Sequence, residues 1–242
     1  MNRYALWIEY DGAPYRGFQR LTPRNVELKA GRGSPRCWPR QQTVQEELEL
    51  KLSTLCSESV KVWSSGRTDQ GVHATCQVVT FECSRLVDPG KLQSTLGAIL
   101  DPSVRVFRVE AVGPDFHPRF SARQRTYHYY ILAPASSRTS PFWSRCCWLL
   151  EEDLDIAAMQ RAAQGLLGRH DFTAYGRKLQ DDQESRVREL LALRFLPNFV
   201  ASSTVHGPFA QLSNLLCVEV CANAFLRRMV RQLVANLVQV GR

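Results

Sequence analysis

The first half of the chain alternates between strand-like and helix-like patterns of apolar and polar residues. Strand-like runs occupy residues 4–10, 60–63, 76–82 and 104–112. A helix is predicted over 43–56, where Thr43 and the glutamate three residues later match a capping box. A second helix is predicted over 89–100, which begins with a proline. The order β-α-β-β-α-β is that of a ferredoxin-like (split βαβ) unit.

The second half repeats a similar order, without detectable sequence identity to the first. Strands are predicted at 126–132, 146–150, 187–195 and 215–222, although residues 187–195 also fit a helix. Helices are predicted over 153–168, with Gly168 as the C-cap, and over 223–240. The predicted fold class is therefore α+β, with two ferredoxin-like halves, residues 1–114 and 115–242.

Composition and charge narrow the classes of function. Hydrophobic residues make up 44% of the 242 residues, enough to form a buried core, and the net charge of +8 favours a polyanionic partner such as nucleic acid. No apolar run approaches the roughly 20 residues that cross a membrane. Strand-like alternation begins within MNRYALWIEY, so we expect no leader peptide in this sequence. We expect a cytoplasmic protein, with a nuclear or organellar location left open.

The cysteines indicate neither a metal site nor a disulfide framework. None of the eight forms a CxxC pair, and no cysteine–histidine cluster has zinc-finger spacing. Four of them, Cys76, Cys83, Cys217 and Cys221, lie in or beside strand-like runs. We therefore expect buried free thiols in a reducing compartment.

The polar loop SSGRTDQGVHA, residues 64–74, carries more chemistry than a strand connection needs. Its Thr-Asp-Gln-Gly sequence fits an ordinary turn, in which Arg67 would pair with any surface acid. The alternative is a carboxylate, Asp69, held rigid at a strand end and kept ionised by Arg67. Such a carboxylate can act as a nucleophile or as an electrostatic stabiliser. The spacing alone favours the ordinary turn.

Five segments, considered together, favour the catalytic interpretation. They are YDGAPYRGFQ (10–19), SSGRTDQGVHA (64–74), DFHPRFSARQRTYHY (115–129), HDFTAY (170–175) and NAFLRRMVRQ (223–232). With these segments the chain closely resembles the TruA family of tRNA pseudouridine synthases over nearly its whole length. The GRTDQGVHA and DFHPRFSA segments are specific to that family.

The resemblance implies an isomerase that converts uridine to pseudouridine at positions 38 to 40 of tRNA, in the anticodon stem-loop. It also implies a TruA-like fold of two ferredoxin-like halves with an active-site cleft between them, a homodimer, and neither cofactor nor metal. The reaction breaks a C–N glycosidic bond, turns the uracil and rejoins it through C5. Because nothing is oxidised and no group is carried away, the lack of a cofactor motif fits this chemistry.

The resemblance assigns four catalytic residues. Asp69 is the nucleophile, and whether it adds to the ribose carbon or to the pyrimidine ring is left open. Arg67 keeps Asp69 ionised and holds its rotamer. Tyr127 stacks on the target base and takes the C5 proton, the alternative being an ordinary cross-strand aromatic. Arg231 lies near Asp69 or a substrate phosphate.

Other residues are assigned to RNA binding or to structure. Those expected to contact RNA or line the cleft are Gln19, Phe116, His117, Arg119 and, in a basic loop, Arg24, Arg32, Arg36 and Arg40. We expect packing or hydrogen-bonding roles for His73 and Tyr129, and a helix-capping role for His170 and Asp171.

Two rival functions belong to other classes of protein: a non-catalytic RNA-binding protein and an aspartate-dependent hydrolase. RRM-type RNA-binding proteins share this order of elements, but the chain has no RNP1-like aromatic run in the required strand. A synthase acting on another RNA is a closer variant. An aspartate-dependent hydrolase would need a second carboxylate or a metal set. Nucleoside analysis of an unmodified tRNA after incubation with the protein would discriminate between them.

The sequence departs from the family pattern in two places. The loop at residues 20–40, between the first strand and the first helix, is longer than usual and holds three prolines and two glycines. The family's last helix and strand are missing after Gly241, so we expect residues 115–242 to form a truncated unit with one unpaired sheet edge.

The basic loop should strengthen tRNA binding through its charge. Residues 20–40 hold six Arg/Lys against one Glu, a net +5 of the chain's +8. Replacing the six basic residues by serine should weaken tRNA binding and flatten the slope of log affinity against log salt by about 0.7–0.9 for each phosphate that is no longer neutralised. Turnover at saturating tRNA should change little, because such contacts involve the RNA backbone. An unchanged salt slope would show that the loop is a solvated insertion.

Overall fold

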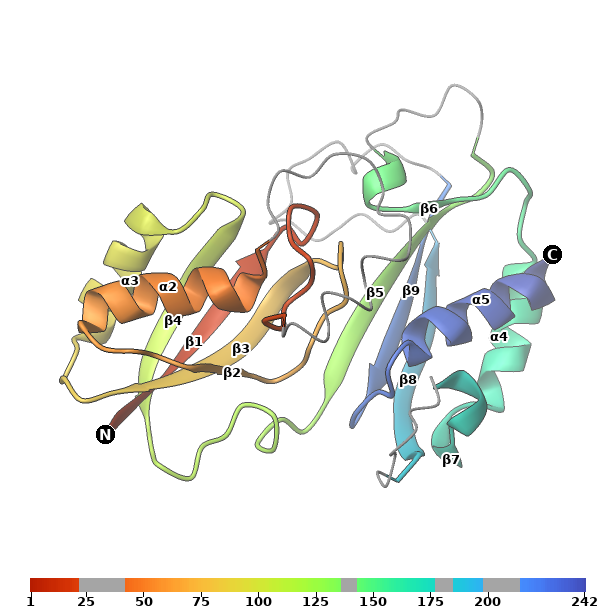
Figure 1. The fold of residues 1–242 in the computed structure, drawn as a ribbon. Helices are drawn as coiled ribbons and strands as arrows, with labels where there is room; N and C mark the ends of the chain where they lie inside the picture. Colours follow the sequence, from red (N-terminus) through yellow and green to blue (C-terminus); the bar gives the residue numbers. More distant parts are fainter. Residues whose placement is uncertain (22–41, 136–142, 177–184, 198–213) are drawn as a thin grey trace. The chain divides into compact units, whose positions relative to one another are not determined.

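The computed structural model describes residues 1–21, 42–135, 143–176, 185–197 and 214–242. The chain divides into two compact units, Met1–Ala122 and Arg123–Arg242, and each unit is described by itself (Figure 1). Among the described residues, each unit pairs one β-sheet with two α-helices, which confirms the predicted α+β fold class. Arg24, Arg32, Arg36 and Arg40 of the basic loop, together with Cys37, lie outside the described residues.

The first unit is a four-stranded antiparallel sheet in the order β2-β3-β1-β4. Its elements are β1 (Asn2–Tyr10), α2 (Val44–Cys56), β2 (Val62–Ser64), β3 (Ala74–Cys83), α3 (Pro89–Ile99) and β4 (Val104–Val112). These elements follow the β-α-β-β-α-β order and lie close to the ranges that the sequence predicts.

Alternation along β1 separates the two faces of this sheet. Leu6 and Ile8 are buried in one core with Leu48 of α2 and Leu96 of α3, so both helices cover the same face. On the opposite face, the guanidinium carbon of Arg108 lies 4.5 Å from the centre of the Trp7 ring. The predicted capping box is present at the start of α2, where the Thr43 side chain accepts a hydrogen bond from the Glu46 amide.

The second unit is a five-stranded sheet in the order β6-β5-β9-β8-β7, with α4 and α5 packed on one face (Figure 1). Its elements are β5 (Arg125–Leu132), β6 (Trp148–Leu149), α4 (Ile156–Gln164), β7 (Gly168–Asp171), β8 (Val187–Pro197), β9 (Leu215–Ala222), α5 (Met229–Gly241) and two single turns of 3₁₀ helix, Trp143–Arg145 and Thr173–Tyr175. β6 runs parallel to β5, and the other pairs are antiparallel. Residues 187–195, which also fitted a helix, belong to strand β8.

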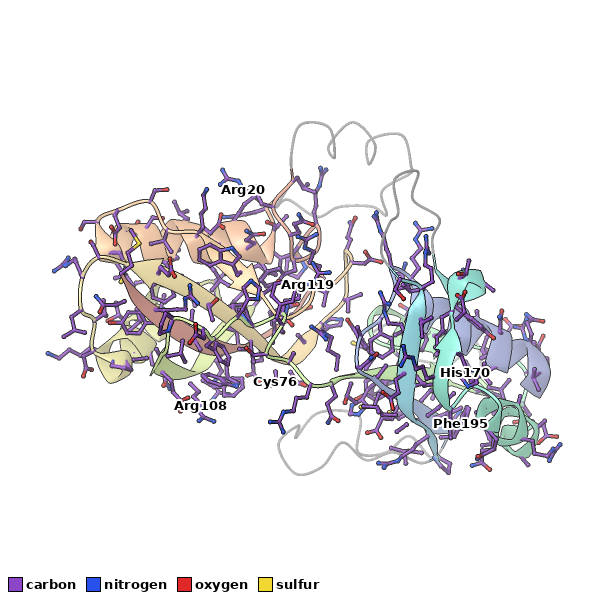
Figure 2. The ribbon with its side chains drawn as sticks, turned by 90° about the horizontal axis from the view of Figure 1, so that it is seen from below. Arg20, Cys76, Arg108, Arg119, His170 and Phe195 are labelled. Atoms are coloured by element: carbon purple, nitrogen blue, oxygen red, sulfur yellow. The ribbon has the colours of Figure 1, made fainter. Side chains whose placement is uncertain are left out.

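The predicted end of the helix over 153–168 is wrong. α4 ends at Gln164 with Gly165 as its C-cap, and Gly168, at φ 90°, begins β7. His170 therefore lies in a strand beside β8, which carries Phe195 (Figure 2). Asp171 does not cap α4; its carboxylate accepts hydrogen bonds from the Thr173 hydroxyl and amide, and these bonds lower the pKa of the carboxyl.

The predicted start of the last helix is also wrong. α5 begins at Met229, after Arg228 in the left-handed conformation at φ 67°. The Asn223 side chain accepts hydrogen bonds from the amides of Ala224 and Glu189. This local bonding competes with helix formation and holds residues 223–228 as an irregular lead-in.

The thiols are largely, but not all, buried as predicted. Five of the seven described cysteines are buried, and burial raises the pKa of Cys56 to about 12, which keeps that thiol protonated. Cys76 is exposed, contrary to expectation (Figure 2). In the described ranges, we find no cluster of three metal-binding side chains and no helix long and apolar enough to cross a membrane.

Candidate functional site

Asp69 lies half-buried in the loop that joins β2 to β3. No described residue donates a hydrogen bond to its carboxylate, so both oxygens remain available to a ligand. The base of the loop is held by the buried side chain of Gln77, whose amide donates to the Gly66 carbonyl. The Ser65 amide donates to the Val78 carbonyl at 2.9 Å and closes the strand end beneath the loop.

A second segment, residues 11–18, packs against the backbone of the Asp69 loop. The Phe18 amide donates to the Thr68 carbonyl at 3.1 Å, and the Tyr10 hydroxyl lies 2.8 Å from the Thr68 hydroxyl. Gly17 has φ 96°, and a Cβ there would lie 2.9 Å from the Thr68 carbonyl oxygen and 3.2 Å from the Asp69 carbonyl carbon. Only glycine fits a position that combines left-handed backbone with so close an approach.

The same segment supports the far end of the loop. A Cβ on Gly12 would lie 2.0 Å from the Val72 carbonyl oxygen, so the two backbones are in direct contact. The His73 Nδ1 atom lies 3.3 Å from the Gly12 amide and 3.0 Å from an Asp11 carboxylate oxygen. The neutral ring can accept from the amide, and the protonated ring can donate to the carboxylate. Either bond gives His73 the hydrogen-bonding role expected from the sequence.

The segment is in turn fixed to the start of α2. The amides of Val44 and Gln45 donate to the carbonyls of Gly17 and Phe18 at 3.3 and 3.0 Å. These donors belong to the first turn of the helix, where backbone amides have no partner inside the helix. Residues 11–18 therefore connect β1, α2 and the Asp69 loop. Sequence reasoning missed this support, although the two glycines in YDGAPYRG were a signal for it.

Arg67 is exposed and lies two residues before Asp69 in the same loop. The ion pairs within the described part of the chain do not include one between these two side chains. The expected contact between Arg67 and the carboxylate stays a prediction.

The other RNA-binding candidates of the first unit lie on loops. Gln19 is exposed after the segment 11–18, and Arg20 beside it forms ion pairs with Glu46 and Glu49 of α2 (Figure 2). Phe116, His117 and Arg119 lie on the loop after β4. The Arg3 guanidinium fixes this loop by donating to the Phe116 carbonyl at 3.0 Å.

Tyr127 is a half-buried residue of β5, in the second unit, paired with Val220 of β9. Its ring meets Phe225 edge-on, with centroids 5.1 Å apart and an interplanar angle of 88°. Tyr129 follows on the same face and packs into the core beside Trp148, at 6.3 Å between centroids. Burial raises the pKa of Tyr129, and the Arg231 charge partly opposes that rise.

Arg231 lies exposed in the first turn of α5. A positive charge near the N-terminus of a helix interacts unfavourably with the helix dipole, so Arg231 does not stabilise α5. Its electrostatic effect on Tyr129 places the charge near β5. The described residues thus hold two groups of candidates: Arg67 and Asp69 with their supporting segment in the first unit, and Tyr127 and Arg231 in the second.

Comparison with known proteins gives consistent matches. The profile of the family described as tRNA pseudouridine synthase matches residues 34–121 and 162–242. The chain is 34% identical to tRNA pseudouridine synthase A of Thermotoga sp. (strain RQ2), covering 100% of this chain and 85% of that protein. It is 36% identical to tRNA pseudouridine synthase A of Xanthomonas euvesicatoria pv. vesicatoria (strain 85-10), covering 99% and 80%.

A side chain at position 17 should destabilise the protein more than a left-handed conformation alone explains, because Gly17 also lies in close contact with the backbone of the Asp69 loop. Gly71 is the matched control, because it also has positive φ, 77°, but nothing lies within 4 Å of its added Cβ. Gly71→Ala should cost about 1–2 kcal/mol from left-handed strain. Gly17→Ala should cost more in urea denaturation and should speed amide exchange across residues 68–72. Equal effects of the two substitutions would contradict the close approach at Gly17.

Proposed function

The chain belongs to the tRNA pseudouridine synthase family, whose members are isomerases, and we propose that it converts uridine to pseudouridine in the anticodon stem-loop of tRNA with Asp69 as nucleophile. Positions 38 to 40 are the proposed target uridines. The observation that carries the proposal is the Asp69 loop, whose backbone is held on both sides while its carboxylate stays without a hydrogen-bond donor among the described residues.

The chemistry needs an anion at a fixed position. In the net reaction the C1′–N1 bond of uridine breaks, a C1′–C5 bond forms, the C5 proton is released and N1 takes up a proton, so the composition of the nucleoside is unchanged. A carboxylate can form a transient covalent bond to the substrate during this exchange. Holding the carboxylate in place before the substrate arrives lowers the entropic cost of reaching the transition state.

The remaining catalytic candidates have distinct proposed roles. Tyr127 stacks on the target uracil after the base leaves its helical stack, and its hydroxyl takes part in removing the C5 proton. Support comes from Phe225, which braces the Tyr127 ring from its edge. Arg231 neutralises a substrate phosphate, which would account for a cation in the first turn of α5. Arg67, exposed in the same loop as Asp69, favours the ionised carboxylate and meets RNA phosphates.

RNA binding is proposed to rest on the chain's positive charge. The net charge of +8 favours an RNA backbone, and the basic loop with Arg24, Arg32, Arg36 and Arg40 contributes a large share of it. Gln19, Phe116, His117 and Arg119 are proposed to contact the RNA from the first unit. On the family resemblance, we also propose a homodimer that acts in the cytoplasm without a metal or cofactor.

Asp69→Asn should abolish turnover and leave tRNA affinity within about twofold. The amide keeps the shape of the side chain but cannot act as the nucleophile, so pseudouridine should no longer form on an unmodified tRNA transcript. Asp153→Asn, an exposed carboxylate of the second unit, is the matched control and should leave the rate unchanged. Near-normal turnover by the Asp69→Asn protein would exclude Asp69 as nucleophile. Mapping of the product by sequencing tests positions 38 to 40 separately.

Tyr127→Phe should bind tRNA normally but turn over roughly 10²-fold more slowly, because it keeps the ring and removes the hydroxyl. Tyr127→Leu should also weaken binding, by about 1–3 kcal/mol, because the target base then has no ring to stack on. Tyr129→Phe, on the same strand face, is the control and should change neither quantity. Equal, unimpaired single-turnover rates for the unsubstituted, Tyr127→Phe and Tyr127→Leu proteins would remove Tyr127 from the site.

A further inference from the structure

Phe120, on the loop between β4 and β5, is unusual for its exposure. Its side chain is 77% exposed, the highest value for any aromatic residue in the described part of the chain. A ring in this position gains little from burial within its own unit. Single exposed apolar side chains are common on protein surfaces, so the meaning of this ring depends on the residues around it.

The ring is not a loose surface side chain, because the His117 ring packs against it in a tilted arrangement. The two ring centroids are 4.5 Å apart at an interplanar angle of 37°. The guanidinium carbon of Arg119 lies 5.9 Å from the centre of the Phe120 ring. His117 is the only described residue whose ring packs on Phe120, so much of the Phe120 ring remains open to a further planar group.

Hydrogen bonds hold the turn that presents these rings. The Ser121 amide donates to the His117 carbonyl at 2.8 Å, and the His117 amide donates to the Ser121 hydroxyl at 3.1 Å. The Arg119 amide donates to His117 Nδ1 at 3.2 Å, which fixes the plane of the imidazole. Arg3 of β1 donates to the carbonyls of Pro114 and Phe116 and ties the turn to the sheet. The platform is therefore organised before any ligand arrives, which reduces the entropic cost of binding.

The charge around the turn favours a nucleic acid over a protein surface. Residues 115–125 hold Arg119, Arg123 and Arg125 against a single acid, Asp115. An open aromatic face next to arginines is the arrangement with which proteins bind unpaired bases, since the ring stacks on the base and the cations meet the phosphates.

We propose that Phe120, backed by His117, is a stacking platform for an unpaired RNA base other than the target uridine. The proposal rests on the proposed function, because it takes tRNA as the ligand. The platform contributes to RNA affinity and orientation and takes no part in the bond changes, so removing it affects binding of the RNA without removing the nucleophile.

Equilibrium binding of an unmodified tRNA transcript tests the platform. Phe120→Leu keeps an apolar side chain but removes the flat ring, and it should weaken binding roughly 5- to 100-fold, the range for one base stack. Phe120→Trp should bind within about twofold of the unsubstituted protein. The slope of log affinity against log salt should stay the same in both variants, because stacking releases no counterions. Leu86→Ala, which removes an 87% exposed apolar side chain from another loop of the same unit, is the control and should have no effect.

Three other results of these experiments would each lead to a different conclusion. If Phe120→Leu binds the transcript as tightly as the unsubstituted protein, the platform does not exist. If it instead lowers the mass measured by sedimentation without changing RNA affinity, Phe120 contacts a second protein chain and the RNA proposal is overturned. If the unsubstituted protein makes no pseudouridine but its RNA binding depends on the ring at position 120, the proposed function fails and the stacking platform stands.

Discussion

The first unit depends on direct backbone contact between two loops. Gly12 and Gly17 let the segment after β1 approach the Asp69 loop so closely that a single methyl group at either position would meet a carbonyl oxygen. The carbonyls of the same segment accept hydrogen bonds from the first turn of α2. The position of one carboxylate is thus determined jointly by a strand, a helix terminus and a glycine pair. A displacement of any of the three would shift the carboxylate, because backbone atoms in direct contact cannot rearrange as side chains can.

The arrangement of helices and strands could largely be predicted from the sequence, because alternation and helical spacing report which residues face a core. The predictions that failed did so where local bonding overrode the pattern. Residues 223–228 continue the helical spacing of α5, but the Asn223 side chain captures backbone amides there and Arg228 takes a left-handed conformation. The short strand β7 was missed because Gly168 fits a helix C-cap as well as a strand start, and only pairing with β8 decides between them.

The residue types of the candidate site could be predicted from the sequence, but the contacts that hold those residues in place could not. Asp69 and Tyr127 stand out through motifs, since side-chain chemistry is visible in a sequence. The contacts that hold Asp69 run mainly between backbone atoms of segments far apart in the chain, and such contacts leave only glycines as a trace. The contact of Phe225 with Tyr127 depends on the turn before α5, which no periodicity reveals. Phe120 was overlooked because its exposure, not its residue type, sets it apart.

The pairing of β5 with β9 has a consequence for the order in which the molecule forms during translation. The Asp69 loop and its supporting segment belong to the first unit, whose elements are complete before β5 emerges from the ribosome. Tyr127 must wait, because its strand partner Val220 and its ring partner Phe225 are synthesised much later. The nascent chain therefore carries an organised Asp69 loop well before Tyr127 is held by its neighbours, and the newly made first unit can be structured while the second is still incomplete.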